Sequence, residues 1–177
     1  VFMLTTQLSR RAYVYLALIP ELVREQGWVW QLVTYMFVHA NFSHILFNMV
    51  GLYVFGIPLE REMGSSEFLV YYLSTGVGVG IISLLLGANV VGASGAIYAL
   101  LLAFATYFPH SRIFVFGILP LQSPVAVLVF AVMSVLFQAT GFQGGVAQFA
   151  HFAGIVLGSL YFLLRFGVNP IRIFLDR

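Results

Sequence analysis

Charged residues leave three long gaps in this chain, and those gaps constrain its fold more than any other feature. No Asp, Glu, Lys or Arg occurs in residues 26–59, 68–111 or 113–164. A membrane-spanning helix needs about 20 apolar residues, so the first gap has room for one span and each of the others for two. We therefore predict an all-α polytopic membrane protein. The expected spans are at about 42–59, 68–87, 93–109, 121–138 and 149–166.

The composition excludes several classes of protein. Only 8% of the 177 residues are charged, against about 25% in a soluble domain. A net charge of +2 without a basic cluster argues against nucleic acid as a partner. Because cysteine is absent, disulfides, thiolate metal sites and thiol nucleophiles are excluded. The sequence shows no internal repeat and no second domain, so we interpret residues 1–177 as one membrane domain in the lipid bilayer. The sequence does not indicate an oligomeric state.

The stretch 7–41 differs from the spans. It is too polar at its start to cross a membrane, and it contains Trp28, Trp30 and Tyr35. Trp and Tyr prefer the level of the lipid headgroups, so we interpret this stretch as an interfacial loop with short helices. His39 and His110 lie at the edges of predicted spans and are also interpreted as interfacial.

Arginines in the loops predict the orientation, because cytoplasmic loops carry an excess of basic residues. Alternating the spans puts five arginines on one side, which we take as the cytoplasm: Arg61, Arg112, Arg165, Arg172 and Arg177. The other side has three: Arg10, Arg11 and Arg24.

Few polar side chains occur inside the predicted spans, and such residues usually face the interior of a bundle. They are His44, Asn48, Ser94, Tyr98 and His151. The three spans that carry them run in the same direction. Each residue lies within about two helical turns of the start of its span, so all five share one depth, in the outer half of the membrane.

Spacing brings some of these residues together. His44 and Asn48 are four residues apart, as are Ser94 and Tyr98, so each pair shares a helix face. Small residues recur at every fourth position in two spans: Gly95, Ala99 and Ala103, and Ala150, Gly154 and Gly158. Such stripes let membrane helices pack closely. The contact would bring Ser94 to His151, as a nucleophile and its general base.

The string Gly92-Ala93-Ser94-Gly95 marks a junction between a loop and a helix. Glycine permits a sharp turn, and the free N–H groups of a helix start suit an oxyanion. Asn48 and His44 could donate to the same anion. Because no carboxylate occurs in any span, we predict a Ser–His dyad rather than a triad, with Tyr98 stacked on the imidazole.

Each of these polar residues could also have a purely structural role. Ser94 could cap its helix, and His44 with Asn48 could form an interhelical hydrogen bond. His151 could be a buried bundle histidine or a proton relay. A proton-coupled transporter would need ionisable residues across the whole membrane depth, whereas these cluster at one level. The H-E-x-x-H motif of metalloproteases and an intramembrane Asp are both absent.

Four stretches resemble, in order, motifs of the rhomboid family of intramembrane serine proteases of prokaryotic type. They are Trp30–Gly56, with the H-x-x-x-N pair, Leu59–Gly64, Gly92–Tyr98 and Ala150–Gly158. The resemblance covers about residues 13–166. It implies a rhomboid-like helical bundle whose spans correspond to the second to sixth helices of a six-helix core. Val1–Thr6 resembles the end of the first helix, which is expected to be truncated or unobserved.

The resemblance also implies roles for individual residues. Ser94 would be the nucleophile, His151 the general base and Tyr98 the residue that orients it. The oxyanion hole would comprise Asn48, His44 and the Ser94 N–H. The motif glycines would be Gly92 and Gly95.

The activity implied by the resemblance is cleavage of transmembrane segments of other membrane proteins, without metal or other cofactor. The implied location is the bacterial cytoplasmic membrane, with the site open to the outer side. The alternative is a non-catalytic rhomboid-like binder of transmembrane helices.

The first loop and the surroundings of the site carry two further expectations. Gln31 stands where many family members have Arg after the Trp. The substrate is expected to approach past the span 121–138, and the charge-free loop 139–147 is predicted to cap the site.

Overall fold

The computed structural model describes residues 7–115, 118–140 and 146–175. Short helices come first: α1 (Gln7–Leu16), α2 (Pro20–Gln26), α3 (Gln31–Thr34) and the 3-10 turn η1 (Tyr35–Phe37). The longer helical segments follow: α4 (Phe42–Gly51), the π-helical turn η2 (Leu52–Gly56), α5 (Ile57–Met63), α6 (Ser65–Leu85), α7 (Ser94–Tyr107), α8 (Ser123–Thr140) and α9 (Val146–Phe166). Two strands, β1 (Arg112–Val115) and β2 (Leu119–Gln122), lie between α7 and α8, and α10 (Pro170–Leu175) follows α9.

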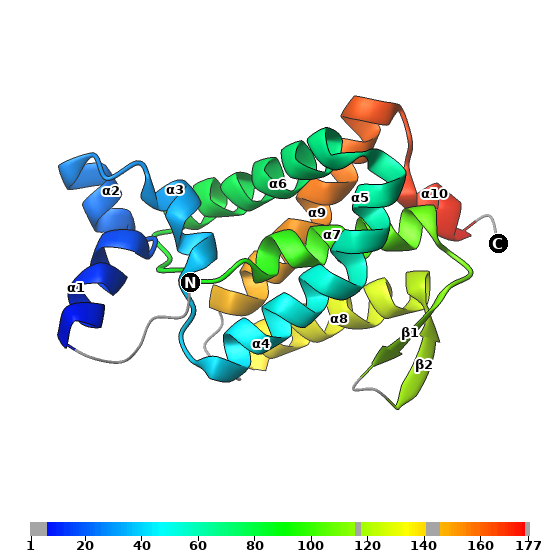
Figure 1. Cartoon of the computed structure of the whole chain (residues 1–177), viewed down its shortest axis with the longest axis horizontal. Coiled ribbons are helices and arrows are strands. Elements are labelled where there is room, and N and C mark those ends of the chain that lie inside the picture. The colour runs from blue at the N-terminus through cyan, green and yellow to red at the C-terminus, as the bar shows by residue number, and fades with distance from the viewer. Residues whose placement is uncertain (1–6, 116–117, 141–145, 176–177) are drawn as a thin grey trace.

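Helix α7 lies at the centre of the bundle (Figure 1). It contacts α4, α6, α8 and α9, and its longest contact is with α9. Its middle residues, including Ala99, Leu100 and Ala103, are fully buried. A helix surrounded by other helices needs no polar face, which explains why its sequence is apolar all round.

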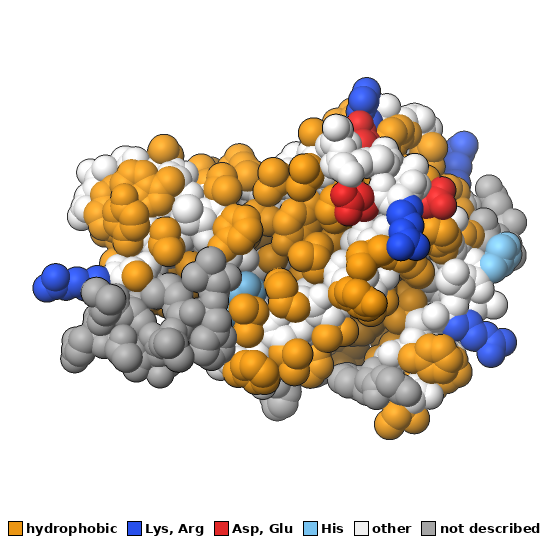
Figure 2. Space-filling view, in the orientation of Figure 1, with side chains coloured by type: hydrophobic (Ala, Val, Ile, Leu, Met, Phe, Trp, Pro, Cys, Tyr) orange, Lys and Arg blue, Asp and Glu red, His pale blue; other side chains and the backbone are white. Residues whose placement is uncertain are grey.

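The face of the molecule shown in Figure 2 is mainly hydrophobic, and its charged side chains lie towards the two ends of the long axis. Within the described residues, three helices are long and apolar enough to cross a membrane: Phe42–Met63, Ser65–Leu85 and Gln148–Phe166. Ser94–Tyr107 and Ser123–Leu136 are apolar but shorter. This distribution is that of a protein whose solvent is lipid along its sides and water at its ends.

Two connectors differ from the expectation. The stretch Glu60–Met63, expected in a loop, continues the helix, which breaks only at Gly64 with φ +80°. The connector 109–120 contains strand β1, which pairs antiparallel with β2, Arg112 facing Gln122 and Val115 facing Leu119. Strands of four residues are too short to give a clear alternating pattern in the sequence.

The region before α4 is anchored by Gln31, whose side chain is completely buried. Its Oε1 accepts a hydrogen bond from the Ile19 N–H at 3.0 Å, and its Nε2 donates to the Val14 carbonyl at 2.9 Å. An isolated bridge joins Leu18 to Val90, just before α7. The glutamine therefore ties the short helices of the α1–α3 region to one another, and the bridge holds this region against the segment that leads into the central helix. The expected end of a first helix, Val1–Thr6, and residues 141–145 of the expected cap lie outside the described residues.

Candidate active site

Ser94 and His151 lie within hydrogen-bonding distance of each other. Ser94 is the first residue of α7, and His151 lies in the second turn of α9. The Ser94 Oγ and His151 Nε2 atoms are 2.8 Å apart. If Nε2 accepts the serine proton, the neutral ring carries its own proton on Nδ1. This is the geometry in which an imidazole can act as a base towards a hydroxyl.

Close packing of α7 on α9 brings the two residues together, as the small-residue stripes predict. A Cβ atom added at Gly154 would lie 1.9 Å from the Gly95 carbonyl oxygen. One added at Gly158 would lie 3.2 Å from the Ala99 Cβ. The two backbones therefore touch at Gly95, one residue after Ser94, and at Gly154, three residues after His151.

Tyr98 stacks on the imidazole of His151. Their ring centroids are 4.2 Å apart and the ring planes differ by 5°. Tyr98 lies one helical turn after Ser94, so a single face of α7 carries both side chains. Such a stack restricts the rotation of the histidine ring and favours the orientation in which Nε2 faces the serine.

The imidazole of His44 lies close to the turn that precedes Ser94. Gly92 has φ +96°, and its N–H donates to the Tyr35 carbonyl at 2.9 Å. A Cβ atom at Gly92 would lie 2.5 Å from the His44 Nε2. The imidazole of His44 therefore packs against the turn that leads into α7. The second motif glycine, Gly95, belongs to the α7–α9 packing described above.

Asn48 lies one helical turn beyond His44 and is only 3% exposed. Its Nδ2 donates to the His44 carbonyl at 2.6 Å. An amide nitrogen carries two hydrogens, so one remains for another acceptor. Of the predicted oxyanion donors, His44 contacts the turn directly, whereas the one hydrogen bond described for Asn48 is to its own helix.

His39 is a neighbour of the site that the sequence interpretation did not include. Its side chain is 9% exposed, and its ring meets that of His44 edge-on with the centroids 5.1 Å apart. Burial, reinforced by His44, lowers the pKa of His39 to about 4, so it is neutral at pH 7. Because His39 precedes the helix that carries His44, helical spacing gives no signal of this contact.

Buried polar atoms without a hydrogen bond concentrate at this site. Among the described residues they belong to His39, Asn48 and His151. Buried groups of this kind are costly, and a native structure retains few of them without a functional reason. Among the residues that the structure describes, no group of three His, Asp or Glu side chains lies close enough together to hold a metal ion.

The sequence of this helical bundle matches the rhomboid domain over residues 26–168. RHOMBOID-like protein 4 of Arabidopsis thaliana is 34% identical over 133 residues, which cover 74% of this chain and 32% of that protein. The mitochondrial rhomboid protein 1 of Saccharomyces cerevisiae is 31% identical over 137 residues, 71% of this chain and 38% of the yeast protein. Rhomboid protease GlpG of Yersinia pseudotuberculosis is 31% identical over 136 residues, which cover 75% of this chain and 46% of that protein.

The chain therefore belongs to the rhomboid family. It is an integral membrane protein, and the predicted all-α rhomboid-like bundle is confirmed. At family level, membership supports intramembrane proteolysis. The chain spans about a third to a half of the length of the relatives it matches.

Proposed function

We propose that this chain is an intramembrane serine endopeptidase that cleaves transmembrane segments of other membrane proteins. The observation that carries the proposal is the 2.8 Å contact between the Ser94 Oγ and the His151 Nε2. Two features support it: the stack of Tyr98 on His151, and the relative from Yersinia whose name is that of a protease. A non-catalytic binder would have no need of an aligned hydroxyl and imidazole.

The mechanism follows from the groups at hand. The Ser94 Oγ attacks the scissile carbonyl while the His151 Nε2 takes the serine proton. The protonated imidazole then gives this proton to the leaving amine as the peptide C–N bond breaks. Water, deprotonated by the same histidine, hydrolyses the acyl-enzyme and releases Ser94. The oxyanion of each tetrahedral intermediate is stabilised by the Ser94 N–H, with His44 and Asn48 as further donors.

A transmembrane helix must open before it can react, because its carbonyls are hydrogen-bonded within the helix. The substrate segment therefore unwinds locally at the site. Approach past α8 is the route we propose. Helices α7 and α9 both start towards the α1–α3 end of the molecule (Figure 1), so we place the site near the outer face of a bacterial cytoplasmic membrane.

Replacement of the nucleophile tests the proposal. In liposomes with a fluorescent transmembrane substrate, Ser94→Ala should lower kcat by at least about three orders of magnitude. Ser74→Ala is the matched control, because the Ser74 hydroxyl donates to the Tyr71 carbonyl of its own helix α6. Cleavage by Ser94→Ala at the wild-type rate would show that Ser94 is not the nucleophile.

A fluorophosphonate probe separates the enzyme from a rhomboid-like binder. The probe should label Ser94 in the wild-type protein, and labelling should be lost in His151→Ala because the general base is missing. Retention of a bound transmembrane helix without labelling or turnover would instead favour the binder.

A further inference from the structure

Tyr98, the residue that stacks on the dyad histidine, has a second aromatic partner from a different helix. The ring of Phe130 in α8 meets the ring of Tyr98 edge-on, with centroids 5.9 Å apart and planes at 80°. Tyr98 and Phe130 belong to one apolar cluster, together with Ile155 of α9. Tyr98 therefore joins the helix that carries the base to α8.

Ser134 of α8 engages the other end of the tyrosine. It is 1% exposed and lies one helical turn after Phe130. Its hydroxyl donates to the Phe130 carbonyl at 2.8 Å, and its side chain lies close enough to the Tyr98 hydroxyl to interact with it. The ring and the hydroxyl of Tyr98 thus both contact one face of α8.

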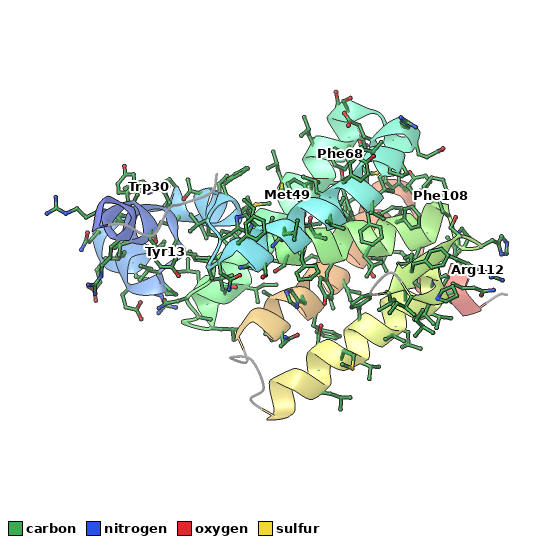
Figure 3. The ribbon with its side chains drawn as sticks, turned by 60° about the horizontal axis from the view of Figure 1, so that its bottom comes forward. Tyr13, Trp30, Met49, Phe68, Phe108 and Arg112 are labelled. Atoms are coloured by element: carbon green, nitrogen blue, oxygen red, sulfur yellow. The ribbon has the colours of Figure 1, made fainter. Side chains whose placement is uncertain are left out.

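The turned view of Figure 3 helps to place these contacts. Tyr13 and Trp30 mark the α1–α3 end of the molecule, and Phe108 and Arg112 mark the opposite end. Helix α8 runs beside α7 and α9 between these two ends. It is therefore the element that closes the dyad region on one flank.

We infer that Phe130 is a positioning residue for His151 and acts through Tyr98. The inference rests on the proposed function. The His151 Nδ1 has no hydrogen-bond partner among the described residues, so no carboxylate or carbonyl there holds the ring. Beside the contact of Nε2 with Ser94, the stack on Tyr98 is the described contact that fixes the ring plane, and it depends on how the Tyr98 side chain is itself held.

A consequence concerns α8 as a whole. Because Phe130 and Ser134 lie on α8, a shift of this helix away from α7 changes the orientation of His151 without contact with either dyad residue.

The test is steady-state cleavage of a transmembrane substrate by the full chain in liposomes. Phe130→Leu keeps an apolar side chain of similar size but removes the aromatic edge. It should lower kcat about three- to tenfold, with KM changed less than twofold. Phe130→Tyr keeps the ring and should restore most of the rate. Leu128→Ala changes a residue of the same helix that is 64% exposed, and it should match the wild type.

Fluorophosphonate labelling of Ser94 gives a second readout, because it depends on the base but not on recognition of a peptide. Its rate should fall in Phe130→Leu by the same factor as kcat. Should that variant fail to fold, Phe130→Met takes its place, because it also removes the aromatic edge and keeps a long apolar side chain.

Wild-type kcat and labelling in Phe130→Leu would overturn the inference. A raised KM with unchanged kcat would also overturn it, since Phe130 would then be a substrate contact. If the loss of kcat were accompanied by a lower melting temperature and disappeared on cooling, Phe130 would contribute to stability alone, which would also overturn the inference. Activity in Ser94→Ala would instead overturn the proposed function. The proposed function and the role of Phe130 are therefore contradicted by different results.

Discussion

Gly92 is the residue whose identity the structure constrains most clearly. Its φ of +96° is a conformation that residues with a Cβ rarely adopt. Any Cβ at this position would also overlap the His44 imidazole, with the Nε2 atom at 2.5 Å. Two independent constraints, one from the backbone and one from a neighbouring helix, therefore require glycine just before Ser94.

Gly92→Ala should both destabilise the protein and impair the site. The backbone strain costs about 1–2 kcal/mol, and the added methyl group displaces His44. Gly87→Ala is the matched control, because Gly87 has φ +69° but nothing within 4 Å of an added Cβ. We expect both variants to melt at a lower temperature in detergent, and only Gly92→Ala to lose most fluorophosphonate labelling. Equal labelling of the two variants would contradict a role for the His44 contact.

At the scale of elements, the contact between α7 and α9 decides where the dyad residues meet. The backbones of the two helices touch at Gly95 and Gly154. In a membrane, helices gain little from hydrophobic association, so packing of this closeness is a main source of their affinity. A change of a single methyl group at this point is expected to move both helices.

Gly154→Ala should lower the stability by about 1–3 kcal/mol, the usual cost of overpacking. An added Cβ would lie 1.9 Å from a backbone oxygen, which cannot rotate away. In Gly78→Ala the added atom would meet the end of a flexible side chain, that of Leu157, at 2.9 Å. This control should be neutral or slightly stabilising, because alanine favours helix over glycine. Melting in detergent compares the two, and equal stability would refute the role of the Gly95–Gly154 contact.

The α1–α3 region shows how one substitution in a motif can be accommodated. Gln31 stands where many family members have Arg, yet its buried amide both accepts from Ile19 and donates to Val14. An amide is neutral and can pair with an N–H and a carbonyl at once, whereas a guanidinium only donates and remains charged. The glutamine therefore satisfies this pair of backbone groups at a lower desolvation cost.

On the scale of the whole molecule, one ionic cluster lies far from the dyad. The Glu67 carboxylate, at the start of α6, accepts from the Tyr161 hydroxyl at 2.6 Å and from the Arg165 Nε at 3.0 Å. The cluster joins α6 to the end of α9. It lies at the end of the bundle where α5 and α10 are also found (Figure 1), opposite the α1–α3 region.

The orientation in the membrane follows from the distribution of arginines. Four arginines lie in α5, β1, α9 and α10, and Arg177 follows them in the sequence, whereas three arginines lie in α1 and α2. This difference predicts that the α5–α10 side faces the cytoplasm. A green fluorescent protein fused after Arg177 should therefore fluoresce in a bacterial host, and alkaline phosphatase fused there should be inactive. An active phosphatase fusion would reverse the orientation and place the dyad on the cytoplasmic side.

Much of the fold could be predicted because charge-free length and helical spacing are local properties. The gaps between charges predict the apolar helices, and the small-residue stripes predict the contact of α7 with α9. Short strands such as Arg112–Val115 escape prediction, since four residues give too little periodicity. The helical continuation to Met63 escapes it as well, because charged residues there resemble a loop.

Within the site, the sequence alone determined the pairs that share one helix, such as His44 with Asn48 and Ser94 with Tyr98. A helix repeats every 3.6 residues, so such neighbours follow from spacing. Only the tertiary structure decided how far the Ser94 Oγ lies from His151, and that His39 packs on His44 and Phe130 on Tyr98. These contacts join different elements, and their geometry depends on how the whole bundle packs rather than on the spacing of residues within any one helix.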